Sequence, residues 1–506
     1  MNRSFPWRAA AFLVCLLLMP AVSLLSGLTA QSNTPKEEGT CLGLPILAAD
    51  TPVSAGLLPP QILYQGEPAP LDTKTGTLYI SVPLPPGSQP HEPDGVLAAA
   101  DNGWALAFAP DPAFADLPKA AANGHAFRLL ASGRDGTASL RVIFTPLPVV
   151  CMDTTDGSDY GDPYAEHSGS VRVFEPASVS PERSFARWHR RGMTTRLFKK
   201  GSWKLSLTNS FGKSLNRSFA GLGSDDDWIL NSMGMDDLKL REKLVMELWN
   251  GMQTEHGMRM SSGEYAEVVL DGEYMGLYLL QRRVDVKYLG LEKSRDIVLK
   301  GGNYVGAMRS VQDAFSIKDS PLPEDKTYAL AENFFSMDDL SALDAASFVD
   351  MEVFVLFAAL YDNLSFRNAY YVLSPGEGGY QIRMLPWDTD LAFGLRYVEG
   401  RGYVLLDDHE TALPFEHRRE YEAMKALLPD LDARIAARWQ ALRKSTLSDK
   451  NIFTSLVGIM DQITLSGAFA RDRALWGTRY GEDDTFDALE ACIRNRLSQL
   501  DAMLIP

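Results

Sequence analysis

Cysteine is scarce in this chain, which has four cysteines among 506 residues. Cys15 falls in an apolar N-terminal stretch, and this leaves Cys41, Cys151 and Cys492 for the rest of the chain. No Cys-x-x-Cys pair or Cys/His spacing is present, which argues against a zinc cluster. Three cysteines allow one disulfide, but a chain of this length with so few is not a disulfide-stapled scaffold.

An excess of positive charge is also absent, because 49 Lys and Arg face 65 Asp and Glu, for a net charge of −16. Proteins bind the phosphate backbone of nucleic acids mainly through Lys and Arg, so this balance argues against a nucleic-acid partner. Hydrophobic residues make up 45% of the chain. That content suffices for one large or two medium cores, and global disorder is not expected.

Acidic residues are missing from the start of the chain, where the first is Glu37. Arg3 and Arg8 precede an uncharged apolar stretch, "AAAFLVCLLLMPAVSLLSGLTA", that ends in small residues. This pattern predicts a secretory signal peptide over residues 1–30 and an exported protein. The alternative is an uncleaved anchor, since residues 9–30 could nearly span a bilayer. In either case, contact with a membrane is expected only through this segment.

The amino-acid composition and the pattern of apolar residues change several times after the predicted signal peptide. Residues 31–60 are rich in Pro, Ser, Thr and Gly and predict a linker, and short apolar runs over 61–142 predict a β-rich accessory domain. The polar stretch 152–170 lacks a Glu at the twelfth position, where an EF-hand loop needs one, so a solvated loop is favoured over a calcium site. Apolar spacing predicts a helix over 236–252 and a buried helix over 347–361.

Turn signals predict two hairpins. "DGEY" contains the Asp-Gly pair typical of a tight hairpin turn, and "GEGG" separates two strand-like runs, "NAYYVLSP" and "YQIRMLPW". Residues 409–506 are expected to form helices with short breaks.

One basic cluster stands out against the acidic whole. The stretch "RSFARWHRRGMTTRLFKKGSWK", residues 183–204, contains eight Lys or Arg and no acid. Such a concentration suits an anionic ligand, for example a nucleotide phosphate. A solvated edge strand protected by its lysines explains the same pattern equally well.

Two acidic segments follow the predicted buried helix. In "LYDNLSFRNAYYV", Asp362 and Asn363 come directly after the helix and Asn368 precedes a strand. A carboxylate and an amide on one loop can orient a hydroxyl and complete a metal shell, although an ordinary Asp-Asn turn is the commoner case. In "MLPWDTDLAFG", Asp388 and Asp390 would point to the same side if the segment were extended, and Mg²⁺ would then neutralise them.

Five segments in this order resemble the CotH family of spore-coat-type atypical protein kinases. They are "RRGMTTRLFKKGSWKLSL", "SDDDWIL", "DGEYMGLYLLQRRVD", "DNLSFRN" and "MLPWDTDLAFG", and the resemblance covers about residues 145–400. The order of basic strand, helix, hairpin, catalytic loop and metal turn also follows the logic of protein kinases. The resemblance implies an α+β, protein-kinase-like bilobal fold, with an N-lobe over 143–285 and a C-lobe over 286–506.

The resemblance also implies a chemistry. It points to transfer of the γ-phosphate of ATP, with Mg²⁺ or Mn²⁺, to Ser or Thr of a protein substrate outside the cytoplasm, in the cell envelope or at a spore surface. Asp362 would be the catalytic aspartate. Asp388 would bind the metal, with Asn368 as a second ligand and Asp390 in support.

The same resemblance assigns the nucleotide contacts. Lys204 or Lys200 would pair with the ATP phosphates, and Arg190 and Arg191 would clamp phosphates or support the acidic turn. The segment 279–284, with Gln281 and Arg282, would lie beside adenine. The acidic partner of the lysine stays open between Glu242 and Glu247.

Some features depart from the standard kinase set. The chain has no His-Arg-Asp, no Asp-Phe-Gly and no G-x-G-x-x-G before the lysine strand. Asn368 follows Asp362 by one residue more than in the kinase catalytic loop, which puts its metal role in doubt. Two other functions compete with the kinase hypothesis: a surface or coat structural protein that uses the fold for binding, and a metal-dependent hydrolase or nucleotidyl transferase.

Overall fold

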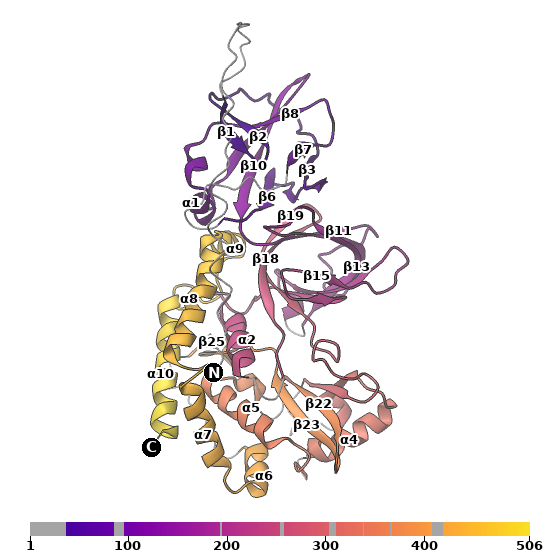
Figure 1. The fold of residues 1–506 in the computed structure, drawn as a ribbon, viewed down its shortest axis with the longest axis vertical. Helices are drawn as coiled ribbons and strands as arrows, with labels where there is room; N and C mark the ends of the chain where they lie inside the picture. Colours follow the sequence, from indigo (N-terminus) through magenta and orange to yellow (C-terminus); the bar gives the residue numbers. More distant parts are fainter. Residues whose placement is uncertain are drawn as a thin grey trace, which may run out of the picture. The chain divides into compact units, whose positions relative to one another are not determined.

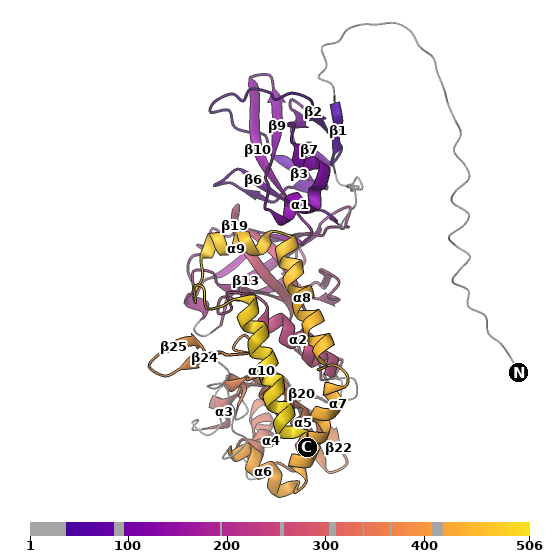
Figure 2. The same cartoon turned by 90° about the vertical axis from the view of Figure 1, so that its left-hand side faces the viewer.

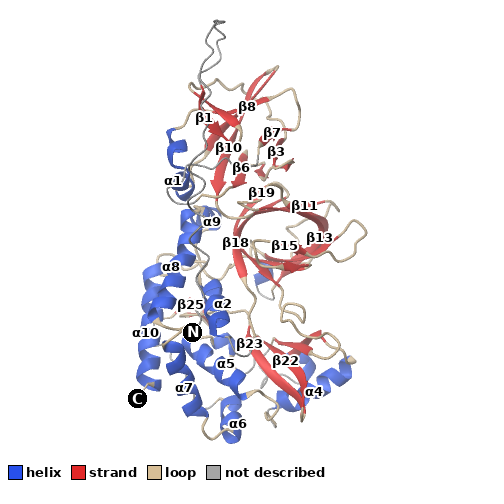
Figure 3. Cartoon of the chain, in the orientation of Figure 1, coloured by secondary structure: helices blue, strands red, loops and turns tan. Residues whose placement is uncertain are grey.

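The structure is a computed structural model that describes residues 37–84, 96–192, 195–252, 258–302, 310–336, 339–364, 367–406 and 418–505. The predicted signal peptide lies outside the described residues. The described chain mixes sheets and helices, which confirms the predicted α+β class. Strands dominate up to Arg282, and most helices follow it (Figures 1 and 3).

The first part of the fold is a seven-stranded sheet with the order β1-β2-β8-β9-β10-β6-β5. Its strands are β1 (Glu37–Cys41), β2 (Leu44–Leu47), β5 (Leu71–Asp72), β6 (Thr77–Ser81), β8 (Ala105–Phe108), β9 (Phe127–Gly133) and β10 (Gly136–Thr145). A smaller sheet contains β3 (Ile62–Tyr64), β4 (Glu67–Pro68) and β7 (Leu97–Ala99), and α1 (Leu117–Ala122) packs against β10.

This accessory sheet begins earlier and ends later than the sequence indicated. β1 and β2 lie inside residues 31–60, where a linker was expected, and β10 continues past residue 142. In β2, buried and half-buried residues alternate. That alternation is the signature of a half-buried strand, but four residues beside Pro and Gly are too few to stand out in a sequence.

A closed barrel follows, with the strand order β11-β12-β13-β14-β17-β19-β18 (Figure 1). Its strands are β11 (Val149–Thr154), β12 (Glu166–Phe174), β13 (Glu182–Arg191), β14 (Ser202–Thr208), β17 (Asp227–Asn231), β18 (Gly263–Leu270) and β19 (Glu273–Arg282). Parallel pairing of β11 with β18 closes it. A two-stranded ribbon of β15 (Arg217–Ser218) and β16 (Ser224–Asp225) lies in the connection before β17.

Side-chain alternation gives the barrel an apolar interior, while its outer face carries polar residues as well as apolar ones, such as Leu277 and Val149, that pack against the neighbouring parts of the fold. Trp188, Trp203 and Trp228 are fully buried in the interior cluster. Lys204 pairs with Ile229, and Ile229 with Gln281, so these three form one row on the outer face. The outer face near the ends of β13, β14 and β19 therefore carries three residues of the predicted nucleotide site, Arg191, Lys204 and Gln281.

Two predictions concerning this part are confirmed. The Asp-Gly hairpin joins β18 to β19, and both Asp271 (φ 48°) and Gly272 (φ 70°) have the left-handed backbone that a type I′ turn requires. The predicted helix over 236–252 is present as α2 (Arg241–Met252). It begins later than expected because Asp236 accepts the backbone N–H groups of Leu238 and Arg241 and holds the preceding residues in a turn.

The rest of the chain combines one sheet with helices. The sheet has the order β21-β20-β22-β23, with β20 (Ile297–Gly301), β21 (Phe315–Asp319), β22 (Ala369–Gly376) and β23 (Gly379–Pro386). The second predicted hairpin is β22–β23. A separate hairpin contains β24 (Leu395–Val398) and β25 (Gly402–Leu405). The helices are α3 (Val311–Ala314), α4 (Glu324–Ser336), α5 (Ala345–Ala358), α6 (Arg419–Leu427), α7 (Leu431–Arg443), α8 (Asp449–Leu465), α9 (Ala468–Trp476) and α10 (Phe486–Leu504).

The predicted buried helix is α5, in which every side chain from Ser347 to Ala358 is buried. Asp344 caps it by accepting the N–H of Ser347. α8 contacts α1 of the accessory part and α2 beside the barrel, so it joins both to the helical part (Figure 2). No described helix is by itself long and apolar enough to cross a membrane; α8 and α9 reach that length and composition only as a pair bent by 73°.

Candidate active site

The loop after α5 presents Asp362. The helix ends at Ala359, whose left-handed backbone (φ 52°) turns the chain into a short 3-10 helix, Tyr361–Asn363. One carboxylate oxygen of Asp362 accepts a hydrogen bond of 2.8 Å from the Asn368 amide, and the other lies 2.7 Å from Arg367. Burial raises the pKa of Asp362, and the negative charge of Asp388 adds to this effect. The sequence-predicted pair Asp362 and Asn368 is therefore in direct contact.

Asp388 follows the end of β23 on a tight turn. The segment was considered as an extended one, and that expectation is wrong: Asp388 has a left-handed backbone (φ 58°), while its neighbour Thr389 is fully buried. Aspartate tolerates this conformation better than most residues do. Asp388 is exposed and Asp390 is partly buried, so strand alternation does not relate them. Burial, followed by the charge of Asp388, raises the pKa of Asp390 well above its ordinary value.

Asn363 joins the two acidic segments. Its amide donates to the carbonyl of Asn368 at 2.7 Å and to the carbonyl of Trp387 at 2.8 Å. The backbone N–H of Trp387 also donates to the carbonyl of Asn368, at 2.8 Å. Sequence reasoning placed Asn363 on the loop but gave it no specific role, because one of its partners, Trp387, lies on another segment of the chain.

Glu242, on α2, faces the same group of carboxylates. It accepts hydrogen bonds from Asn231 at 2.5 Å and Gln281 at 3.0 Å. Burial raises its pKa to about 7, and Asp388 adds to the increase. Glu247, the alternative in the sequence, has a more exposed side chain and pairs with Lys243 at 3.3 Å. Of the two acids, the structure thus brings Glu242 toward Asp388.

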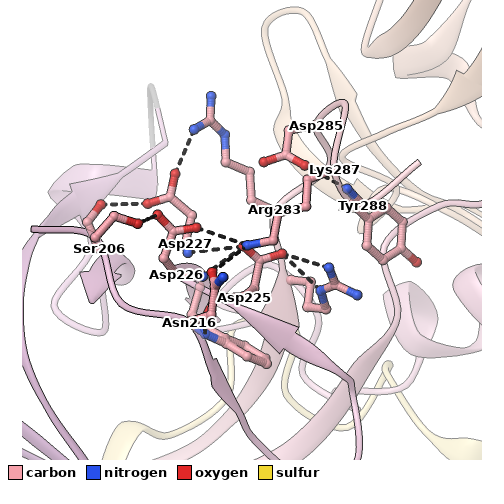
Figure 4. A network of polar contacts seen from close by, with 12 residues as sticks. Ser206, Asn216, Asp225, Asp226, Asp227, Arg283, Asp285, Lys287 and Tyr288 are labelled. Atoms are coloured by element: carbon pink, nitrogen blue, oxygen red, sulfur yellow. Dashed lines mark hydrogen bonds and ion pairs between the residues drawn. The ribbon is translucent and has the colours of Figure 1, made fainter. Parts of the chain in front are cut away.

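Lys204 is held by the acidic segment "SDDDWIL" and not by Glu242. Its ammonium group lies 3.2 Å from Asp227, which also pairs with Arg283 at 2.7 Å and accepts a hydrogen bond from Ser206 (Figure 4). Burial alone would raise the pKa of Asp227, but the Ser206 hydrogen bond and the charges of Lys204 and Arg283 lower it. Asp227 therefore stays ionised and fixes two cations on the outer face of the barrel.

More cations meet at Trp387, just before Asp388. Arg191 at the end of β13 and Lys300 on β20 both lie 5.4 Å from the centre of the Trp387 ring. Burial lowers the pKa of Lys300 to about 8, against the opposing effect of Asp388. Burial, and then the positive charges of Arg283, Arg191 and Lys204, lowers the pKa of Lys318 on β21. Lys318 therefore belongs to the same cluster of cations. Lys300 and Lys318 were missed in the sequence, where each is a single lysine in an unremarkable strand.

Three residues predicted to bind ATP are directed elsewhere. Lys200 is buried and donates to Asp472 and to the carbonyl of Leu277, both at 2.5 Å, which ties the barrel to α9. Arg190 points into the barrel, where it lies 5.2 Å from the ring of Trp203 and bonds backbone carbonyls.

Arg282 is the third of these residues. It donates two hydrogen bonds to Asp225, which also pairs with Lys287 (Figure 4). Alternation along β13 and β19 places Arg190 and Arg282 on other faces than Arg191 and Gln281.

The donor set suits a hard cation that shares its shell with another ligand. Within the described ranges, no three His, Cys, Asp or Glu side chains are placed to hold a metal ion by themselves. Burial, and then the negative charge of Asp388, nevertheless raises the pKa of both Asp362 and Asp390. A divalent cation would relieve this repulsion, and Mg²⁺ commonly binds one or two carboxylates plus phosphate oxygens.

Comparison with known proteins identifies a family for most of the chain. The family model described as CotH kinase protein matches residues 189–500, which is more than half of the chain and includes Glu242, Asp362 and Asp388. A comparison with curated proteins returned no match. On the strength of this match, the chain belongs to the CotH kinase protein family.

Proposed function

We propose that the chain is an atypical protein kinase that transfers the γ-phosphate of ATP to Ser or Thr of a protein substrate. The observation that carries the proposal is the junction made by Asn363, which brings the Asp362 loop and the Asp388 turn together. Cations from the barrel and from the four-stranded sheet converge on the residue beside Asp388. Clustered carboxylates facing clustered cations suit a metal–nucleotide complex.

Asp362 would act on the acceptor hydroxyl. Its raised pKa favours proton acceptance, and the hydrogen bond from Asn368 fixes its orientation. In the transfer, the hydroxyl oxygen forms a bond to the γ-phosphorus, the bond from that phosphorus to the β-phosphate oxygen breaks, and ADP leaves. The hydroxyl proton passes to Asp362 and then to solvent.

Asp388, Asn368 and Asp390 would hold the metal ion. Bound Mg²⁺ or Mn²⁺ would neutralise charge on the phosphate oxygens during transfer. The raised pKa of Asp390 supports this assignment, since a cation is the simplest way to keep both aspartates ionised.

Arg191 and Lys204 would bind the phosphates, joined by Lys300, Arg283 and Lys318. Gln281, which is fully buried beside Glu242, would lie at the adenine side. Lys200, Arg190 and Arg282 have structural partners instead, so we assign them to the stability of the fold.

The barrel would be the N-lobe and the helical part the C-lobe of a kinase-like bilobal fold. The N-terminal apolar segment supports export, with acceptors among coat, envelope or other surface proteins. Lys204 and Gln281 on the outer barrel face support this arrangement, because Gln281 bonds Glu242, whose pKa is raised by burial and also by the charge of Asp388.

The test is phosphate transfer by purified protein with γ-labelled ATP, Mg²⁺ or Mn²⁺, and a Ser-rich acceptor. Wild type should transfer phosphate to the acceptor or to itself. Asp362→Asn and Asp388→Asn should each lose the signal by at least about a hundredfold, in line with the contribution of general-base and metal-binding groups.

Asp135→Asn is the matched control, because Asp135 is exposed in the turn between β9 and β10 of the accessory sheet. It should keep full activity. A wild-type chain that neither shifts its melting temperature with ATP nor transfers phosphate with either metal contradicts the proposal. A binding or structural role for the fold would then be the better explanation.

A further inference from the structure

A ligand-sized pocket lies outside the candidate active site, and none of Asp362, Asp388 and Asp390 lines it. The pocket has a volume of about 540 Å³. Its walls come from Pro146–Pro148 at the entry to the barrel, from Glu264 and Tyr265 on β18, and from α8 between Gly458 and Leu465. This volume falls in the range of small-molecule pockets, roughly 300–1,000 Å³.

The lining of this pocket has a clear chemical bias. The walls are mostly apolar, and Leu465 on α8 remains 54% exposed beside the opening. The charged side chains that line it, among the described residues, are all carboxylates: Glu175, Glu264 and Asp461. Of the two carboxylates Glu264 and Asp461, Glu264 has an ion-pair partner, Lys243, while Asp461 has none among the described residues. An apolar space with an excess of negative charge at its rim suits an apolar molecule that carries a cation.

The same wall is connected to α2 through Lys243. The ammonium group of Lys243 is buried, lies 3.3 Å from Glu264 and donates to the carbonyl of Gly263 at 2.8 Å. Tyr265 donates to the carbonyl of Lys239, just before α2. Lys243 directly follows Glu242, whose carboxylate bonds Gln281 in the candidate active site. A cation bound to Glu264 would therefore weaken one of the contacts that fix this helix.

We propose that this pocket binds a small molecule with an apolar body and an ammonium or guanidinium group, and that its occupancy changes nucleotide affinity through α2. The second half of the proposal rests on the proposed kinase function. The first half depends only on the pocket and its charges.

Binding is tested with 4-phenylbutylammonium as the probe and the full chain, by titration calorimetry. The charge-reversed molecule 4-phenylbutyrate has the same apolar body, and spermidine has the charge without it. The ammonium probe should bind at least tenfold more tightly than either. Equal affinity for the two phenylbutyl probes, or no binding of the ammonium probe, overturns the proposal.

Two variants locate the binding. Asp461→Asn and Leu465→Lys lie at exposed positions of α8, so the fold should be retained, and each should weaken the probe at least fivefold. Lys450→Met, an exposed change near the start of α8, is the matched control and should leave the affinity unchanged. Unchanged affinity in both pocket variants places the probe elsewhere and contradicts the assignment.

Coupling is measured as the ATP dissociation constant with and without saturating probe. Because coupling between two sites is reciprocal, ATP should change the affinity of the probe by the same factor. If the probe binds without changing the ATP dissociation constant, the proposed coupling between the pocket and the nucleotide site is wrong. If the chain binds no ATP, both the proposed function and the coupling are contradicted. The calorimetric test of probe binding to the pocket does not depend on this result.

Discussion

Lys200 and Lys204 lie on the same basic segment but have opposite surroundings. Lys200 is 5% exposed and pairs with Asp472. Lys204 is partly exposed and pairs with Asp227, which also pairs with Arg283. Lys200→Met should lower the free energy of unfolding by about 3 kcal/mol, because it removes the nearer cation of the buried Asp472 carboxylate and leaves Lys239, 3.9 Å away, as its ion-pair partner. Lys204→Met should instead weaken ATP at least tenfold with little loss of stability.

Denaturant unfolding and ATP titration of both variants check this pair. Lys199→Met serves as the control for loss of a positive charge in the same segment, since Lys199 is exposed. Loss of ATP affinity in Lys200→Met at unchanged stability would return Lys200 to the nucleotide site.

Glu242 should make stability depend on pH. Its pKa rises from the ordinary 4.5 to about 7 in the folded chain. Between these two values the folded state holds a proton that the unfolded state has lost, so stability falls as pH rises from 4.5 to 7. Glu242→Gln removes this cost and should gain up to ~3 kcal/mol on wild type above pH 7, at 1.36 kcal/mol per pKa unit.

Urea unfolding at pH 4.5, 6 and 8, with chelator and without nucleotide, measures the effect. Glu332→Gln changes an exposed residue of α4 and should run parallel to wild type at every pH. Parallel curves for Glu242→Gln as well would show that Glu242 titrates normally.

Asn363 is expected to act on both stability and rate. Asn363→Ala removes two buried hydrogen bonds to carbonyl groups and should cost roughly 2 kcal/mol. Because the bonds align the Asp362 loop with the Asp388 turn, kcat should fall about a hundredfold while the KM for ATP changes little. Asn451→Ala, which removes an exposed amide bond to Ser445, is the control. A loss of stability without loss of kcat would limit Asn363 to a structural role.

At the scale of elements, the turn after Asp388 depends on Gly394. This residue has φ 91°, and an added Cβ would lie 2.8 Å from the carbonyl oxygen of Leu406. Gly394→Ala should cost about 2–3 kcal/mol through backbone strain and this contact. Gly378→Ala in the β22–β23 turn meets no atom within 4 Å and should be neutral. Thermal unfolding of the two variants separates these effects, and an unaffected Gly394→Ala would mean that the turn can relax.

The elements themselves were predictable where the signal was local. The Asp-Gly turn, the apolar run of α5 and the spacing of α2 are all set by neighbours in the chain. Closure of the barrel was not predictable, because it depends on parallel pairing of Val149–Met152 with β18, more than a hundred residues away. The backbone at Asp388 was missed for a similar reason, since contacts with Asn368 and Asn363 hold Trp387 beside it.

The residues of the candidate site were partly predictable. The order of the motifs predicted Asp362, Asn368, Asp388 and Lys204 as site residues. Which side chains of a strand face the site is decided by strand register, which the motifs do not contain. That register separates Arg191 from Arg190 and places Gln281 beside Glu242. Lys300 and Lys318 come from strands whose place in the sheet only tertiary structure defines.

For the whole molecule, the accessory sheet and the barrel should unfold together. Tyr79 of β6 stacks on Tyr274 of β19 with ring centres 4.1 Å apart, and one apolar cluster contains residues of both parts. Tyr79→Ala should therefore lower the stability of the whole chain by about 3–4 kcal/mol in one transition. Calorimetry and tryptophan fluorescence should report the same midpoint. Two separate transitions in the wild type would mean that the accessory sheet folds independently.

The cysteines of the described chain make none of the disulfides that the sequence allowed. Cys41 and Cys151 belong to the cluster shared by the accessory sheet and the barrel, and burial raises the pKa of both thiols to about 12. Such thiols are almost entirely protonated at neutral pH, and only the thiolate reacts with alkylating reagents. Cys492 on α10 is partly exposed and should be alkylated first. The slower rate at which Cys41 and Cys151 are alkylated then measures how often the shared core opens, and no mutation is needed.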